Sequence, residues 1–139
     1  MLPIEPRLFT VRTATSLPST NSLLSMDTIS YQDFERVELR VGKVTEVNDF
    51  PEAKKPAYKL TIDFGPANGG MKRSSAQVTE LYTKEDLLGR LVVCVVNFAP
   101  KQIGPFMSEC LTCGAKDENG SVALLTVDKE NIPIGSKIF

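Results

Sequence analysis

The chain has 139 residues and a formal net charge of −1 at pH 7, which suits one domain with its own hydrophobic core. The near-neutral charge excludes a bulk attraction to nucleic acid, so any such attraction must come from a local patch. The sequence contains no histidine, which removes the commonest general base and the commonest metal ligand.

Residues 1–25 differ in composition from the rest of the chain. They hold many Ser and Thr residues, three Pro residues and a single acidic residue, and they lack the continuous apolar core of a secretory signal. The composition also suits an organellar transit peptide, but we favour a disordered or non-native tail, with one domain from residue 26 to residue 139. No stretch is long enough to span a membrane, so we expect a cytoplasmic protein without membrane insertion.

The first half of this domain shows the period-2 alternation of half-buried strands. Residues 37–47 alternate apolar and polar side chains, and Gly42 within them suggests a bulge or a sharp coil of the strand. Residues 58–64 alternate again, and residues 71–77 form a plausible third strand. The glycine-rich segment 65–70 between them has the composition of a hairpin loop.

The second half begins with the only helix signal. Thr83 is a candidate N-cap for a short helix over residues 84–88, and Gly89 a candidate terminator. The unbroken apolar run 91–96 predicts a strand buried on both sides. A polar, proline-bounded loop then leads to a returning strand over residues 106–113.

The last segments complete an all-β pattern. Asn119 and Gly120 form a strong turn signal before an apolar strand over residues 122–127. About six short strands with one helical turn predict a five-stranded oligonucleotide-binding (OB) barrel. The short helix falls between strands 3 and 4 of that barrel, and extra C-terminal strands follow it.

The three cysteines do not make an even disulfide set, and all of them lie in predicted strands. Cys94 lies in the apolar run, where we expect a small buried hydrophobic residue. Cys110 and Cys113 form a CxxC, but the redox version of this motif lies at a helix N-terminus, and no second CxxC completes a zinc site. We therefore predict structural cysteines and neither a metal nor a cofactor.

Several segments of the domain carry a family likeness. Two of them are VELRVG at residues 37–42 and NFAPKQIGPFMS at residues 97–108, and the others are residues 50–60, 62–65 and 72–77. In this order they resemble the tRNA-binding domain found in methionyl- and tyrosyl-tRNA synthetases and in free-standing proteins. Within this family the chain is most similar to the CsaA group of secretion-related chaperones. The resemblance implies an OB-type barrel, a homodimer, and binding of tRNA or of unfolded preprotein polypeptide.

A cation-rich segment agrees with a nucleic-acid site. Residues 54–73 contain five cations and one acid. We predict that tRNA is bound by Arg40, Lys54, Lys55, Lys59, Lys72, Arg73, Asn97, Lys101 and Ser108. The alternative is a solvated, lysine-rich strand edge that discourages aggregation.

Apolar residues gather in the predicted loops. A peptide-binding groove or a dimer interface is predicted at Phe50, Pro51, Pro56, Tyr58, Phe98, Pro100, Ile103, Phe106 and Met107. We favour the dimer interface for most of them, because exposed apolar patches of this size are rare on monomers. Phe50, Tyr58 and Phe98 could alternatively stack on bases.

The residue inventory argues against catalysis. The serines have no histidine to activate them, and no carboxylate pair or phosphate-binding glycine loop is present. Two hypotheses follow. The first is a non-catalytic, homodimeric, CsaA-like chaperone for export-bound unfolded polypeptides. The alternative is a tRNA-binding module that acts free or in trans to an aminoacyl-tRNA synthetase.

Overall fold

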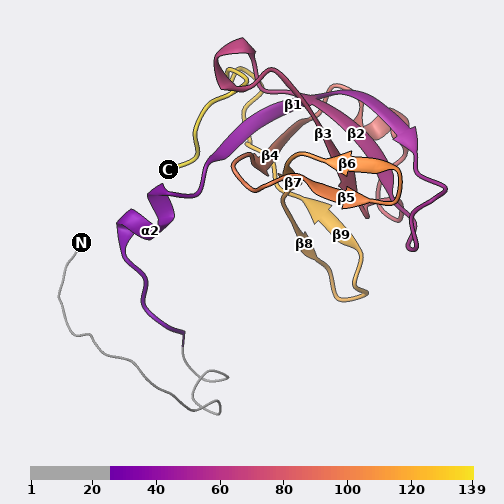
Figure 1. Cartoon of the computed structure of the whole chain (residues 1–139), viewed down its shortest axis with the longest axis horizontal. Coiled ribbons are helices and arrows are strands. Elements are labelled where there is room, and N and C mark those ends of the chain that lie inside the picture. Colours follow the sequence, from indigo (N-terminus) through magenta and orange to yellow (C-terminus); the bar gives the residue numbers. More distant parts are fainter. Residues whose placement is uncertain (1–25) are drawn as a thin grey trace. The chain divides into compact units, whose positions relative to one another are not determined.

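The computed structural model describes residues 26–139, and the chain divides into two units between Phe34 and Glu35 (Figure 1). The predicted tail at 1–25 lies outside the described residues. Helix α2 (Tyr31–Glu35) begins with a reciprocal cap between Ser30 and Asp33. The Ser30 hydroxyl accepts from the Asp33 N–H, and the Asp33 carboxylate accepts from the Ser30 N–H.

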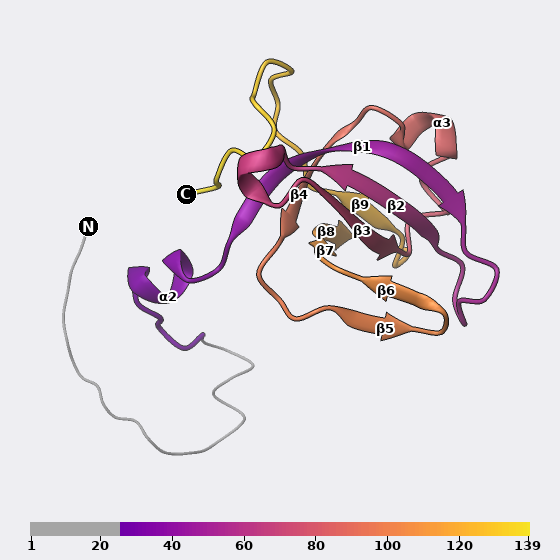
Figure 2. The same ribbon diagram turned by 45° about the horizontal axis from the view of Figure 1, so that its top comes forward.

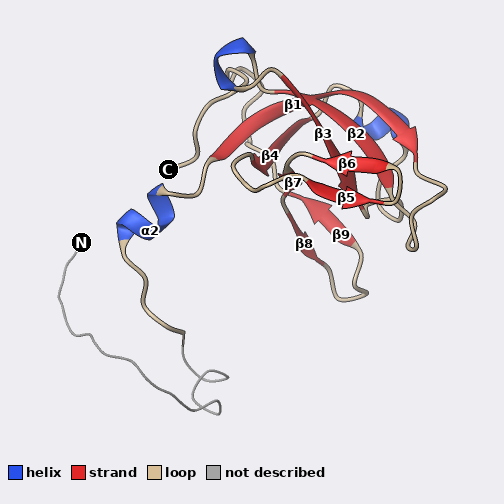
Figure 3. Ribbon diagram, in the orientation of Figure 1, coloured by secondary structure: helices blue, strands red, loops and turns tan. Residues whose placement is uncertain are grey.

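The second unit is built on one antiparallel five-stranded sheet in the order β3-β2-β1-β4-β7 (Figure 3). Its strands are β1 (Leu39–Asp49), β2 (Tyr58–Asp63), β3 (Met71–Ala76), β4 (Leu91–Val95) and β7 (Leu111–Thr112). The Glu109 N–H, just before β7, donates to the Arg73 carbonyl of β3 at 2.7 Å. This bond joins the two edges of the sheet, so the strands form a nearly closed barrel, as predicted.

Two short helical segments connect the barrel strands. The 3-10 turn η1 (Pro66–Asn68) links β2 to β3, and helix α3 (Lys84–Leu87) lies between β3 and β4. Thr83 caps α3 through a capping box with Asp86, which confirms the predicted N-cap. The position of α3 after the third strand is the one that the OB pattern requires.

Two hairpins are added to the barrel. The first is β5 (Lys101–Ile103) with β6 (Phe106–Ser108), and the second is β8 (Gly114–Lys116) with β9 (Val122–Leu124). The β5–β6 hairpin contacts β3 (Figure 2). The prediction of one continuous returning strand was wrong, because the chain pairs locally across Gly104 (φ 57°) before it joins the barrel as β7.

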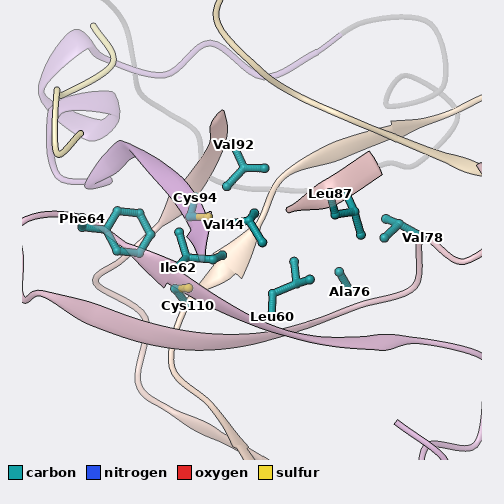
Figure 4. Close-up of a cluster of buried hydrophobic side chains, with 10 residues drawn as sticks. All are labelled: Val44, Leu60, Ile62, Phe64, Ala76, Val78, Leu87, Val92, Cys94 and Cys110. Atoms are coloured by element: carbon teal, nitrogen blue, oxygen red, sulfur yellow. The ribbon is translucent and has the colours of Figure 1, made fainter. Parts of the chain in front are cut away.

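The main core fills the barrel (Figure 4). Its buried members are Val44, Leu60, Ile62, Phe64, Ala76, Val78, Leu87, Val92, Cys94 and Cys110. Strand β4 is buried at Val92, Val93, Cys94 and Val95, which confirms the prediction from its unbroken apolar run.

Gly42 has a different role from the one predicted. The irregularity of β1 lies between Val44 and Glu46, so the predicted bulge at Gly42 was wrong. A Cβ on Gly42 would lie 2.5 Å from Ile62 Cγ2 and 2.6 Å from the Phe64 ring. The glycine is therefore required by close packing of β1 on the core.

Among the described residues, no helix has the length and apolar character that crossing a membrane requires.

Candidate nucleic-acid interface

A second, smaller hydrophobic cluster joins two loops. Its buried members are Phe50 and Ala57 from the β1–β2 loop and Phe106 from β6. The rings of Phe50 and Phe106 lie 5.3 Å apart and are 4% and 6% exposed. We call this group, with the partly buried Ala53 and Ile103, the loop cluster. A peptide-binding groove, one of the two predictions for these residues, would need exposed rings, whereas each ring is buried as the other's packing partner.

Two cations lie over the rings of the loop cluster. Lys59 Nζ is 5.5 Å from the centroid of Phe50, and Arg73 Cζ is 5.0 Å from the centroid of Phe106. Both distances are within the range of a cation–π attraction. The loop cluster therefore holds two positive charges at fixed positions.

The strand register places these cations on one face of the sheet. Thr61 of β2 is directly opposite Arg73 of β3, and Lys59 is two residues before Thr61. Side chains two residues apart on a strand project from the same side, so Lys59 and Arg73 share a face. We call the side of β1, β2 and β3 that carries them the outer face.

A shallow pocket of about 210 Å³ opens on this outer face. It is lined by Glu46, Asn48, Lys59, Leu60, Thr61, Arg73 and Phe106. Asn48 and Glu46 come from β1, where they pair with Lys59 and Thr61 of β2. The Asn48 side-chain amide donates to Glu46 Oε2 at 2.8 Å.

Arg73 is anchored through its backbone, so its side chain remains available. Glu109 Oε1 accepts from the Arg73 N–H at 2.9 Å and lies 4.0 Å from Nε. The Arg73 side chain is still 52% exposed. Its neighbour Lys72 pairs with the buried Ile62 and so projects from the opposite side of β3. Of the predicted pair, only Arg73 is on the outer face.

Three further predicted cations belong to the segments that build the loop cluster. Lys54 and Lys55 are exposed in the β1–β2 loop, which contributes Phe50 and Ala57. Lys101 is exposed on β5, opposite Ser108 of the hairpin that contributes Phe106. These two loops flank the sheet face that OB folds use for oligonucleotides.

Two predicted binding residues have partners within the fold. Arg40 forms an ion pair with Glu38 at 2.7 Å and donates to the Gly135 carbonyl at 3.1 Å. Hydrogen bonds from Arg40 and then Lys137 lower the pKa of Glu38. The Asn97 side chain accepts from the Glu38 N–H and donates to the Arg36 carbonyl. Both residues therefore join the start of β1 to neighbouring segments.

The remaining predicted apolar residues differ in exposure. Tyr58 is partly buried against the main core, and its hydroxyl donates to the Tyr82 carbonyl at 2.9 Å. Phe98 is 56% exposed in the loop after β4. Pro51, Pro56 and Pro100 are exposed, and Met107 is partly buried.

The cysteines are free thiols with structural surroundings. A hydrogen bond with Cys110, together with burial, raises the pKa of Cys94. Cys94 Sγ also lies 3.6 Å from the Thr112 hydroxyl, inside the core. In the stretch from residue 26 onward, no group of His, Cys, Asp or Glu side chains is arranged to hold a metal ion.

The sequence reasoning missed Glu46, Asn48 and Thr61. Glu46 is a polar position of the predicted strand over residues 37–47, and this pattern alone could have placed it on an outward side. Asn48 lies past the predicted end of that strand, whereas β1 continues to Asp49. Their position beside Lys59 depends on the irregularity after Val44, which shifts the pairing of β1 with β2. A shift of one residue exchanges the two faces of a strand, so this shift had to be known first.

Comparisons with known proteins agree with this geometry. A sequence model of the family described as "Putative tRNA binding domain" matches residues 39–137. The methionine–tRNA ligases of Methanocaldococcus jannaschii and Pyrococcus furiosus are each 36% identical over 113 residues, or 81% of this chain. That stretch is 17% and 15% of the two ligases, so the chain spans less than a fifth of their length.

Two solved structures are similar over their whole length. The CsaA chaperone protein from Picrophilus torridus is 49% identical with a TM-score of 0.74. The chaperone CsaA from Bacillus anthracis is 45% identical with a TM-score of 0.75. Each alignment covers 81% of this chain and 100% of the other.

Proposed function

Because the chain belongs to the tRNA-binding domain family and is CsaA-like, we propose that it is a non-catalytic, homodimeric binding protein whose outer face binds tRNA. One observation carries the choice of ligand: Lys59 and Arg73 are held over buried rings on the sheet face that OB folds use. Positioned cations of this kind suit the phosphates of a nucleic-acid backbone.

The burial of Phe50 and Phe106 favours tRNA over an apolar peptide at this face. A hydrophobic groove would need these rings to be exposed, whereas they support the two cations from beneath. The exposed Lys54, Lys55 and Lys101 on the flanking segments extend the positive charge beyond the pocket. A chain with net charge −1 thereby presents a local cationic surface.

The test is a titration of bulk tRNA at two salt concentrations with Arg73→Gln. Binding should weaken steeply between about 50 and 200 mM salt, because counterions are released from the phosphates. Arg73→Gln should lower the affinity several-fold and reduce the salt slope by about one unit.

Arg90→Gln is the matched control. Arg90 Cζ lies 5.1 Å from the centroid of Tyr82, the same kind of contact, but Arg90 is outside the pocket lining. Equal affinities for the two variants would contradict binding at the outer face. A flat salt dependence would contradict tRNA binding altogether.

A second candidate is a cytoplasmic chaperone for export-bound unfolded polypeptides. It is favoured by the 45–49% identity to two proteins described as CsaA chaperones, over their full length. Exposed apolar side chains such as Phe98 and Leu111 offer contacts for an extended chain. Suppression of aggregation of an unfolded test protein at high salt, lost in Phe98→Ser, would support this candidate, because apolar contacts are not screened.

The homodimer has its own measurement. Sedimentation equilibrium of the full chain should give twice the 15.3 kDa mass, with and without tRNA. A single monomer mass at micromolar concentration would contradict the homodimer. The tRNA titration would not be affected by that result, because it tests the outer face of one chain.

A further inference from the structure

Glu46 is an unexpected residue on a cationic surface. It lines the same pocket as Lys59 and Arg73, and a face that only bound phosphates would be weakened by a carboxylate there. Within residues 26–139, each ion pair at 4.0 Å or less uses another carboxylate, and the carboxylate paired with Arg73 is Glu109. Neutralising Lys59 or Arg73 by a direct ion pair is therefore not the role of Glu46.

The arrangement of Glu46 leaves hydrogen-bond acceptors free in the pocket. An ionised carboxylate only accepts hydrogen bonds, at about four lone-pair positions. The amide of Asn48 uses one of them, on Oε2, and joins the two side chains on the outer face. The β1 side of the pocket thus offers acceptors, whereas Lys59 and Arg73 offer donors from β2 and β3.

Arg73 adds a flat stacking surface. One side of its guanidinium is over the Phe106 ring, and the side chain is half exposed. Proteins that recognise single-stranded RNA stack unpaired bases on such guanidinium planes and bond their Watson–Crick edges. A base on the free side of Arg73 would have the acceptors of Glu46 within the same pocket.

Resting on tRNA binding at this face, we propose that the pocket binds one unstacked guanine of a single-stranded RNA segment. The Watson–Crick edge of guanine carries two adjacent donors, N1–H and N2–H, beside the acceptor O6. Glu46 accepts from the two donors, and the Lys59 ammonium donates to O6. Adenine, cytosine and uracil lack two adjacent donors on this edge, so the carboxylate discriminates against them.

The size of the pocket agrees with a single base. Pockets for drug-sized ligands are about 300–1,000 Å³. The volume of about 210 Å³ is smaller, and it opens directly on the strand surface. It therefore suits one group of a longer ligand that continues along the sheet and the flanking lysines.

The experiment measures the affinity of the full chain for labelled oligouridylates of about 12 nucleotides, a length that OB folds cover. Each oligomer carries one central G, A, C or U. The G oligomer should bind about tenfold more tightly than the others, which is the discrimination of one good bidentate contact. Glu46→Gln should remove this preference, because the amide offers one acceptor in place of two.

Electrostatics alone makes the opposite prediction for the variant. Removing a negative charge from a phosphate-binding face should strengthen every oligomer equally. A guanine pocket requires that Glu46→Gln lowers the affinity for the G oligomer, while the affinity for the U oligomer stays unchanged or increases. Glu52→Gln, an exposed loop carboxylate outside the pocket lining, is the matched control and should keep the G preference.

The outcomes separate this inference from tRNA binding itself. Salt-dependent binding of all oligomers without a G preference, or with a preference that survives in Glu46→Gln, overturns the guanine pocket alone. Failure of every oligomer and of bulk tRNA overturns the proposed function as well. Glu46 is exposed, so an unchanged urea midpoint is expected and confirms that the variant is folded.

Discussion

The main core and the loop cluster are two hydrophobic groups with different consequences for the molecule. The main core has ten buried members from the barrel strands, α3 and the segments next to them, whereas the loop cluster has three, from the β1–β2 loop and β6. The main core packs inside the barrel. The smaller group lies beneath two cations of the outer face and keeps the two loops together.

This difference separates stability from binding. Residues of the main core come from β1, β2, β3, β4 and α3 and from the segments next to them, so a cavity there weakens the whole unit. Residues of the loop cluster support Lys59 and Arg73 but lie outside the barrel interior. We therefore expect substitutions in the first group to change the free energy of unfolding most, and those in the second to change affinity most.

The largest effect is expected for Phe64→Ala in the main core. Phe64 is completely buried, and its removal should lower the free energy of unfolding by about 3–5 kcal/mol. Urea unfolding followed by circular dichroism measures this loss. Phe98→Ala, which removes an exposed ring, should stay within about 0.5 kcal/mol of the parent. Similar losses of unfolding free energy in Phe64→Ala and Phe98→Ala would contradict the separation of stability from binding.

A smaller loss is expected when the main core is overfilled. In Gly42→Ala the new methyl group meets Ile62 and Phe64, so β1 or these side chains must move. Overpacking of this kind costs about 1–3 kcal/mol. Lys43→Ala, at the adjacent exposed position, is the control in the same urea experiment. Equal midpoints for the two variants would contradict the prediction, because β1 could then move without a loss of stability.

The same comparison explains what could be predicted from the sequence. The apolar run of β4, the Thr83 cap and the alternation of β1 and β2 are local patterns, and the barrel with its short helix follows from them. The role of Gly42 did not follow, because a bulge and a close approach both call for glycine. Only the neighbours Ile62 and Phe64 distinguish the two.

The candidate site was less predictable because it depends on contacts between distant segments. Lys59 and Arg73 were identified as cations, but their rings come from residues 9 and 33 positions away, Phe50 and Phe106. By their sequence, Phe50 is in a loop and Phe106 is at the border between the proline-bounded loop and the predicted returning strand, where exposure is the usual expectation. The alternation of the predicted strand could place Glu46 on an outward side but did not mark it as a binding residue, since its acidity argued against a phosphate-binding surface.

Phe106→Leu tests whether the loop cluster affects affinity more than stability. A leucine keeps most of the apolar volume, so the loss of unfolding free energy should be below about 1.5 kcal/mol. It removes the ring beneath Arg73, and the affinity for tRNA should fall several-fold in a filter-binding titration. Phe98→Leu makes the same exchange at an exposed ring. If the affinity for tRNA falls in both Phe106→Leu and Phe98→Leu, or in neither, the claim that the loop cluster supports tRNA binding is contradicted.

The smallest effect is expected at the cap of α3, whose Leu87 belongs to the main core. The Thr83 backbone N–H and then its hydroxyl hold the pKa of Asp86 below its ordinary value. Because the folded-state pKa is lowered, the stabilisation is present above the ordinary pKa and is lost as pH falls through the lowered value.

Asp86→Asn should therefore be less stable than the parent at pH about 7 and nearly equal to it well below pH about 3.9, the ordinary value. Urea midpoints at the two pH values measure this, with Glu85→Gln in the same turn as a control for the lost charge. If the difference in urea midpoint between the parent and Asp86→Asn becomes larger on acidification, the stabilising role of the Asp86 carboxylate in the cap is contradicted. Affinity for tRNA at neutral pH should not change, because this contact stabilises the main core and is remote in sequence from both loops that build the outer face.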